Sequence, residues 1–166
     1  MGSKFFTKRI LFPILARFSK VYFSSPRNYR YKNIRVKVNP GVFFPHLTIS
    51  TRLLLAFLEG LDLKEKRFLE LGSGTGIISV FAALKGAKVT ASDINPKAIE
   101  NSDQNAKRNN VTIKLIHSDL FDSFDNQKFD IIIINPPYYP KEPKSDEEKA
   151  WFCGTEFQYF SQLFNS

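Results

Sequence analysis

The segment Asn135-Pro136-Pro137-Tyr138 could bind a flat amino group. It directly follows Ile131 to Ile134, an apolar run typical of a strand buried in a parallel sheet, and ligands bind at the carboxyl ends of such strands. Two successive prolines restrict the backbone and remove two N–H donors, so the Asn135 amide oxygen and the Pro136 carbonyl remain as acceptors. Accepting both hydrogens of a planar NH₂ would make its nitrogen more tetrahedral and more nucleophilic. The Tyr138 ring would stack on the plane of the group that carries this NH₂. It would also favour the positive charge that develops when another group is transferred to the nitrogen.

A glycine-rich turn lies between an expected strand and an expected helix. Its glycines let the backbone approach a ligand closely, beside the free N–H groups of a helix start. A dinucleotide fingerprint would place a third glycine where the chain has Ile77, and no Lys-Ser/Thr pair follows as in a Walker-type loop. The turn therefore disfavours pyrophosphate ligands and an NAD-dependent oxidoreductase. Its residues are Glu70, Leu71, Gly72, Ser73, Gly74, Thr75 and Gly76.

Acidic residues end three of the expected strands: Glu70, Asp93 and Asp119. Asp93 lies about 20 residues after Gly72, the spacing at which an acidic side chain accepts hydrogen bonds from a ribose diol. The combined negative charge disfavours a phosphate-rich ligand and suits a cationic one, such as adenosine joined to a positively charged amino acid. The alternative roles are a helix N-cap for Asp93 and a turn for Asp119.

Strands and helices alternate from residue 67 onward, which predicts parallel pairing with right-handed crossovers and a doubly wound α/β fold. The expected strands are 67–71, 88–92, 112–117 and 129–134, and the expected helices are about 75–85, 96–109 and 156–164. Before this series, the pattern predicts a basic amphipathic helix over 5–22, one strand over 31–38 and a helix from 50 or 51 to 59. The charged stretch 141–149 is predicted to be an exposed loop.

Positive charge is concentrated at the N-terminus. The chain has 24 Lys and Arg against 16 Asp and Glu, yet residues 1–40 contain no acid. This predicts a basic arm (1–40) ahead of a ligand-binding domain (41–166), with residues 4–37 available to contact RNA. A solvated positive face and an organelle transit peptide are the alternatives.

Composition excludes several classes of protein. The longest apolar run, Leu53 to Leu58, is far shorter than the ~18 residues that cross a bilayer, so no membrane protein is expected. Cys153 is the single cysteine and cannot form an internal disulfide, which favours a reducing compartment and a cytoplasmic location. His46 and His117 lack metal-ligand spacing, so no metal site is predicted.

Together these motifs resemble those of class I S-adenosylmethionine-dependent methyltransferases, in the branch with an Asn-Pro-Pro-Tyr signature. The stretch from Gly41 to about Phe164 is similar to the HemK-like (PrmC-like) glutamine methyltransferases and their methyltransferase small-domain relatives. Two more segments carry the resemblance. They are Gly41-Val42-Phe43-Phe44-Pro45 with Thr51, and Ala150-Trp151 with Gly154.

The resemblance implies S-adenosyl-L-methionine as the cofactor. Gly72 to Gly76 would hold its methionine portion, Asp93 the ribose hydroxyls, and Asp119 with Leu120 the adenine. The catalytic segment would be Asn135, Pro136, Pro137 and Tyr138, which would hold the acceptor nitrogen. The cofactor-binding residues implied in full are Thr51, Glu70, Gly72, Ser73, Gly74, Thr75, Gly76, Asp93, Asp119, Leu120 and Asn135.

The resemblance also implies a Rossmann-like sheet, of which this chain supplies four of seven strands in the order 3-2-1-4, followed by one helix. The strand ending at Ile134 would then be an exposed apolar edge, which we expect a partner or a second copy to cover. The N-terminal helical domain of bacterial release-factor enzymes has no counterpart here beyond about forty residues rich in Lys and Arg.

The leading hypothesis is an N-methyltransferase acting on a planar amide or amino nitrogen. The acceptor would be a glutamine of a translation factor, or an exocyclic amine of an RNA or DNA base, which must leave the duplex before it can react. The basic arm favours RNA or a ribosome-associated partner. The alternative, from a different class, is a non-catalytic cofactor-binding or RNA-binding fragment of such an enzyme.

Overall fold

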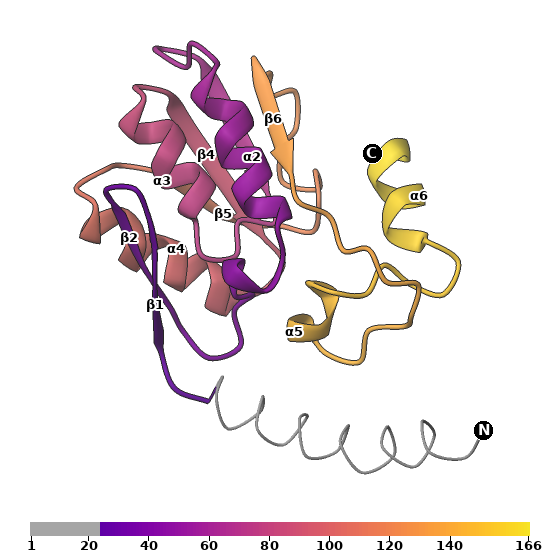
Figure 1. Ribbon diagram of the computed structural model, residues 1–166. Coiled ribbons are helices and arrows are strands. Elements are labelled where there is room, and N and C mark those ends of the chain that lie inside the picture. The colour runs from indigo at the N-terminus through magenta and orange to yellow at the C-terminus, as the bar shows by residue number, and fades with distance from the viewer. Residues whose placement is uncertain (1–23) are drawn as a thin grey trace.

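The computed structural model describes residues 24–166. The amphipathic helix expected over 5–22 lies outside the described residues. Within them the chain forms a twisted sheet with helices packed against it, and a two-stranded hairpin beside the helices (Figure 1). No helix in this part of the chain is long and apolar enough to cross a bilayer.

Four parallel strands form the sheet in the order β5-β4-β3-β6. Counted along the chain this order is 3-2-1-4, so the predicted order and the α/β fold class are confirmed. The chain reverses its direction of winding between β3 and β6, and ligands of such sheets bind where this reversal occurs. The strands are β3 (Arg67–Leu71), β4 (Lys88–Asp93), β5 (Lys114–His117) and β6 (Ile131–Ile134).

The helices that follow the strands begin close to the predicted positions. α3 starts only at Ile77, because Gly76 adopts a left-handed conformation that still belongs to the turn. α4 has Pro96 in its first turn, and the Asn95 side chain caps it by accepting from the Lys97 N–H. The helices and the short 3₁₀ turn are η1 (Pro45–Leu47), α2 (Ser50–Glu59), α3 (Ile77–Leu84), α4 (Pro96–Arg108), α5 (Asp146–Lys149) and α6 (Gln158–Asn165).

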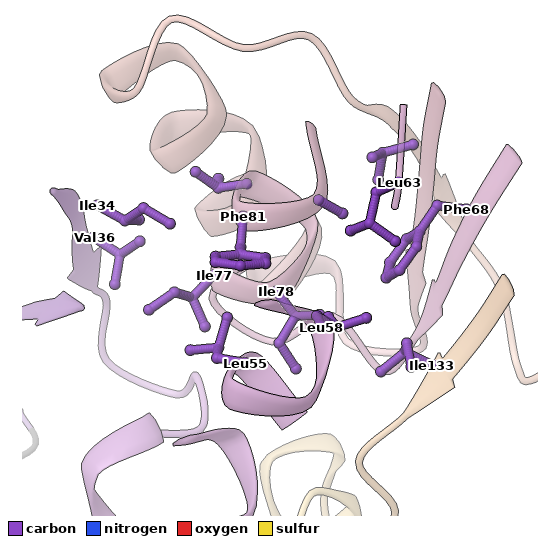
Figure 2. Packing of buried hydrophobic residues seen from close by; sticks show 13 residues of the cluster. Ile34, Val36, Leu55, Leu58, Leu63, Phe68, Ile77, Ile78, Phe81 and Ile133 are labelled. Atoms are coloured by element: carbon purple, nitrogen blue, oxygen red, sulfur yellow. The ribbon is translucent and has the colours of Figure 1, made fainter. Parts of the chain in front are cut away.

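Hydrophobic clusters cover both faces of the sheet, as expected for a doubly wound fold. On one face, Phe68 and Ile133 of the sheet pack with residues of α2, α3 and the hairpin (Figure 2). On the other, Leu69 and Leu71 pack with Phe124 and with Leu163 of α6. Because successive residues of β3 point to opposite faces, one apolar strand serves both clusters.

The hairpin is held to the domain by a row of asparagines on α4. β1 (Arg27–Tyr31) pairs antiparallel with β2 (Ile34–Val38), and the other edge of β2 faces α4. Asn105 accepts from the Lys37 N–H at 2.8 Å and donates to the Lys37 carbonyl at 2.9 Å, and Asn109 does the same for Arg35. Side-chain amides spaced four residues apart on one helix face therefore satisfy a strand edge that would otherwise be open.

Two local predictions are wrong. The single strand expected over 31–38 is instead a hairpin whose two-residue turn contains Lys32 at φ +52, so Tyr31 belongs to the first strand. The loop expected over 141–149 contains α5, whose start is capped by Ser145 accepting from the Glu148 N–H. Ser and Glu at this spacing form a known helix-start signal, which identifies α5 in retrospect.

Candidate functional site

A cavity of about 320 Å³ lies at the carboxyl ends of β3, β4 and β6. It brings together almost all of the residues that the sequence suggested. The predicted residues that line it are Thr51, Glu70, Gly72, Ser73, Gly74, Thr75, Asp93, Asp119, Leu120, Asn135, Pro136, Pro137 and Tyr138. Gly76 is the predicted site residue outside this lining.

The three glycines of the turn have different structural roles. Gly72 has φ +72 and a Cβ added there would meet nothing within 4 Å, so its backbone conformation alone favours glycine. Gly76 has the same φ, but an added Cβ would lie 2.8 Å from the Ser102 Oγ of α4. Gly76 therefore allows close packing of the turn on α4, while Gly72 and Gly74 face the cavity.

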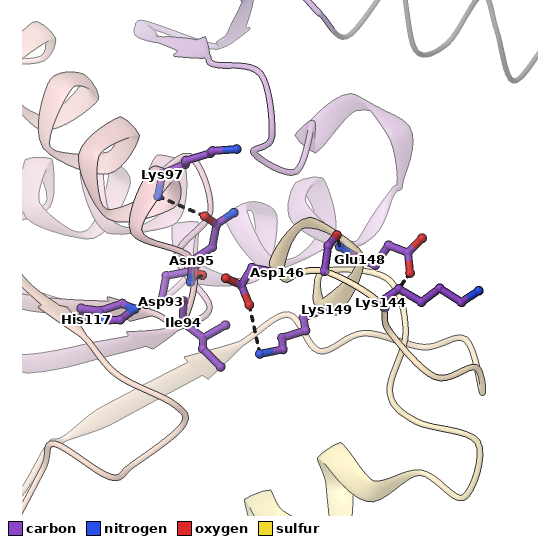
Figure 3. A network of polar contacts seen from close by, with 10 residues as sticks. Asp93, Ile94, Asn95, Lys97, His117, Lys144, Asp146, Glu148 and Lys149 are labelled. Carbon is purple, nitrogen blue, oxygen red and sulfur yellow. Dashed lines mark hydrogen bonds and ion pairs between the residues drawn. The ribbon is translucent and has the colours of Figure 1, made fainter.

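Asp93 joins the turn to the start of α4. Its carboxylate accepts from the Gly74 N–H at 2.8 Å and from the Asn95 N–H at 2.9 Å. Burial raises the pKa of Asp93, while these two N–H groups act in the opposite direction. Figure 3 shows Asp93 beside Asn95, with Lys97 above them on α4. Each carboxylate oxygen keeps a lone pair beyond its backbone bond, so a ribose diol could still donate to Asp93.

Glu70 carries less charge than its sequence position suggested. Its side chain is 3% exposed and accepts from both the backbone N–H and the hydroxyl of Ser79 on α3. Burial raises its pKa to about 8, and the two Ser79 bonds only partly offset this. Near pH 7 Glu70 is therefore mostly protonated, and the negative charge at the cavity comes chiefly from the other carboxylates.

Asn135 and Tyr138 are in direct contact. The Tyr138 hydroxyl donates to the Asn135 Oδ1 at 2.6 Å, the same oxygen that would accept from an acceptor amine. The carbonyl oxygen has two lone pairs, so it can accept from both groups. Tyr138 is 48% exposed, which leaves its ring at the mouth of the cavity.

Asp119 and Leu120 occupy a tight turn directly after β5. Ser118 organises this turn, since its hydroxyl lies 3.2 Å from the Leu120 carbonyl and accepts from the Ser123 N–H at 3.1 Å. Leu120 is buried at φ +39, while the Asp119 side chain is exposed.

Thr51 lies near the start of α2, where it is buried and lines the cavity.

Two cover segments, residues 41–48 and 142–154, meet across the cavity and were not predicted to touch. The rings of Phe43 and Trp151, one from each segment, lie 4.9 Å apart. The second segment is also tied to α4, because the Lys97 Nζ pairs with the Glu147 Oε1 at 2.7 Å. Asn95 donates to the Gly41 carbonyl at 2.9 Å, which ties the first segment to α4. The aromatic composition of both segments was the available signal, but contact between residues about a hundred positions apart is a tertiary property.

Tyr159 is a cavity residue that sequence reasoning missed. It lies on the same face of α6 as Gln158 and Gln162, which also line the cavity. Burial, together with the negative charges of Asp93 and Asp119, raises the pKa of Tyr159 to about 12. Leu163, on the following turn, packs in the second hydrophobic cluster and so fixes α6 beside the cavity.

The charged side chains that line the cavity are mainly acidic. Lys149 is the only Lys or Arg in the lining found among residues 24–166, and it pairs with Asp146 at 3.0 Å (Figure 3). In the same part of the chain, no group of three or more His, Cys, Asp or Glu side chains could hold a metal ion. The cavity suits a ligand with hydroxyl and amino donors and positive charge, and disfavours one rich in phosphate.

Residues 33–151 match the family described as the methyltransferase small domain. The chain belongs to this family. The matched residues include the hairpin strand β2, the glycine turn, Asp93 and the Asn135 to Tyr138 segment. Most of them apart from β2 also line the cavity.

Several curated and solved relatives are similar to this chain. A protein of Methanocaldococcus jannaschii named as a candidate protein N5-glutamine methyltransferase is 44% identical over 119 residues, covering 71% of this chain and 56% of that protein. The release factor glutamine methyltransferase of Fusobacterium nucleatum is 32% identical over 118 residues, covering 69% and 33%. The structure of the T. thermophilus 16S rRNA N2 G1207 methyltransferase with AdoMet and guanosine has a TM-score of 0.61 at 25% identity, covering 70% and 34%. The chain thus spans about half or less of the length of these relatives.

Proposed function

We propose that this chain transfers a methyl group from S-adenosylmethionine to the side-chain amide nitrogen of a glutamine in a protein partner. One observation carries the proposal: the glycine turn, Asp93 and the Asn135 to Tyr138 segment line the same cavity. Membership of the methyltransferase small domain family supports it, as does the 44% identity to a relative named for glutamine methylation.

The lining of the cavity fits this cofactor. Apolar side chains such as Leu71, Ile94 and Leu120 can contact a nucleoside, and Asp93 and Asp119 can accept from its hydroxyl and amino groups. When bound, S-adenosylmethionine supplies an electrophilic methyl group on a positively charged sulfur. The acidic lining favours this positive charge, which would leave the sulfur when the methyl group is transferred.

Asn135 and Pro136 would position the acceptor nitrogen. Their carbonyl oxygens accept hydrogen bonds from its two N–H groups and turn its lone pair toward the methyl group, so the contribution of the protein is mainly orientation. The nitrogen gains a bond to carbon as the carbon–sulfur bond breaks, and it releases one proton. Neither carbonyl is basic enough to keep that proton, which passes to water.

Charge at the cavity mouth favours a protein acceptor over a nucleic acid. Glu142 and Asp146 line the cavity with Asn135, and Lys149, the one lysine of the lining within residues 24–166, pairs with Asp146, so Glu142 is left without a counter-charge in the lining. A phosphodiester strand that entered the cavity would meet a lining whose net charge is negative. The exocyclic amine of a base remains the second candidate, favoured by the similarity to the 16S rRNA N2 G1207 methyltransferase.

The test uses Asn135→Ala, with Asn28→Ala on the exposed face of the hairpin as the matched control. We expect Asn135→Ala to lower the rate of label transfer from radioactive cofactor by about 100-fold or more, a typical loss for one preorganised polar group at a reaction centre. Cofactor affinity measured by calorimetry should change little, because most of the residues expected to contact the cofactor belong to other segments.

The acceptor is identified by incubating the chain with labelled cofactor and cell extract, with and without RNase. Label that stays on protein and maps to glutamine supports the proposal, and label lost with RNase supports the base amine. Cofactor binding without labelling of any component would support the non-catalytic alternative. Normal turnover by Asn135→Ala would refute the role given to Asn135.

A further inference from the structure

The end of the molecule opposite the cavity carries a basic surface. This end is the amino edge of the sheet, where β3, β5 and β6 begin and where α4 ends. Six exposed cations lie at these element ends or on the hairpin beside them, and none forms an ion pair with another described residue. They are Arg35, Lys64, Lys66, Arg108, Lys114 and Lys128.

A hollow of about 360 Å³ is built into this surface where the hairpin meets the ends of α3 and α4. Arg35 and Arg108 line it together with Asn33, Asn109 and Asn110, of which Asn109 already bonds the backbone of Arg35 and Asn105. A guanidinium binds phosphate through two parallel hydrogen bonds, and amide groups bind sugars, phosphates and base edges. The hollow therefore offers the two kinds of group that nucleic-acid surfaces combine.

Arg30 and Arg35 are directly opposite each other across the hairpin. Both are exposed, and like charges in this position destabilise a pair of strands. The Arg30 Nε donates to the Lys32 carbonyl, which orients the guanidinium without neutralising its charge. An anionic partner would remove the repulsion between the two arginines, so their placement favours a ligand with negative charge.

The hollow and the cavity are separated by the length of α4. Asn95 at the start of α4 lines the cavity, while Arg108 and Asn109 at its end line the hollow. A helix of 13 residues is about 20 Å long, so a strand bound at the hollow does not need to enter the cavity. The two ends of α4 also differ in charge, because the hollow is lined by two arginines whereas the cavity lining is mainly acidic.

We infer that the amino edge binds a nucleic-acid strand through its phosphates, at a docking surface centred on Arg35 and Arg108 and separate from the methyl-transfer cavity. The strand is held here as an anchor, and the acceptor reaches the cavity from the opposite end. This inference stands independently of the proposed transfer reaction, because none of its residues lines the cavity.

Binding of a fluorescent single-stranded RNA of about 20 nucleotides to the full chain tests the inference, with anisotropy measured over a series of salt concentrations. The variant is Arg35→Ala with Arg108→Ala. Loss of two phosphate contacts should weaken binding about 25-fold at 0.1 M salt, and make the slope of log affinity against log salt shallower by about 1.4. A DNA strand of the same length in a parallel titration shows whether the 2′-hydroxyls matter.

The matched control is Arg52→Ala with Lys141→Ala, which removes the same charge from exposed residues that line neither the hollow nor the cavity. Each variant keeps the basic residues of the first 23 positions, so any contribution from them is common to all. Normal cofactor affinity shows that each variant is folded. An equal loss of binding in both double variants would overturn the inference, because net charge alone would then explain it. Equal competition by polyglutamate of matched length would overturn it as well.

Discussion

Glu70 shows how one residue of the glycine turn depends on its tertiary surroundings. Its position suggested a charged ligand contact, but in the folded protein it is buried and bonded to Ser79 of α3. A carboxyl group deprived of water holds its proton more tightly, which is why its pKa is raised to about 8. Its bond to the Ser79 N–H also holds the start of α3 beside the turn.

This pKa predicts that the protein loses stability between pH 5 and pH 8. In that range the folded state keeps the proton of Glu70, whereas the unfolded state, with a pKa of 4.5, has released it. Raising the pH therefore favours unfolding, by about 3 kcal/mol over this interval. Urea denaturation at pH 5, 6.5 and 8 measures the effect.

Glu70→Gln is the control for that prediction. The amide has nearly the same shape, its oxygen can accept from Ser79, and it does not titrate. We expect its free energy of unfolding to depend much less on pH than that of the unchanged protein, with a remainder due to Asp93, whose pKa is also raised. An equally steep pH dependence in Glu70→Gln would contradict the assignment.

At the scale of elements, the asparagines of α4 connect the hairpin to the glycine turn. Asn105 is fully buried and donates to the Thr75 carbonyl at 3.0 Å as well as bonding the backbone of Lys37. One side chain thus holds a turn that lines the cavity against a strand of the hairpin. Nothing in the sequence pattern distinguishes Asn105 from an exposed helix asparagine.

Asn105→Ala should destabilise the fold by about 2 to 4 kcal/mol, because it leaves the Lys37 N–H and the Thr75 carbonyl without this partner. Chemical denaturation measures the loss. Lys107→Ala on the exposed side of the same helix removes only a solvent-accessible ion pair with Asp103, and should change stability by less than about 0.5 kcal/mol. Similar losses in the two variants would show that the asparagine bonds contribute little.

The cover segments give a spectroscopic prediction at the same scale. Trp151 is the single tryptophan of the chain, lines the cavity and contacts Phe43. We expect S-adenosylmethionine to change the intrinsic fluorescence of the protein in a saturable way. Phe43→Ala should weaken cofactor binding by about 5- to 10-fold through lost aromatic packing.

The control for this experiment is Phe57→Ala, which changes an exposed phenylalanine of α2 outside the cavity lining. Its titration should match that of the unchanged protein. If Phe43→Ala also titrates normally, the contact between the cover segments has no part in holding the cofactor.

At the scale of the whole molecule, β6 is an edge strand in the described part of the chain. It pairs with β3 on one side, and its Ile132 side chain is 44% exposed. An apolar strand with a free edge is a template for pairing with another chain, which supports the expectation of a partner or a second copy.

Ile132→Lys should therefore reduce concentration-dependent association of the protein, because a lysine on an edge strand opposes pairing. Sedimentation velocity over a range of concentrations measures this. The comparison is Leu53→Lys, which places the same charge at an exposed apolar position on α2. Association that is unchanged by Ile132→Lys, or reduced equally by both variants, would remove β6 from the interface.

The sequence by itself determined the order and type of most elements and the residues at the carboxyl ends of their strands. Alternation of apolar runs with helical patterns, the glycines at 72, 74 and 76, and the Asn-Pro-Pro-Tyr segment are local signals. Each acts through the backbone within a few residues, and the parallel α/β topology then places strand ends on one edge. The resemblance to known methyltransferases added residues such as Thr51 and Leu120, and all of the predicted site residues except Gly76 line one cavity.

Only the tertiary structure decided the burial and protonation of those residues and the side chains that they contact. The protonation of Glu70 depends on removal of water by α3, the contact of Phe43 with Trp151 joins distant segments, and Tyr159 reaches the cavity because α6 packs on the second sheet face. The same holds for the hollow between Arg35 and Arg108 at the far end of α4. Burial and long-range packing arise from the whole chain at once, so no local pattern encodes them.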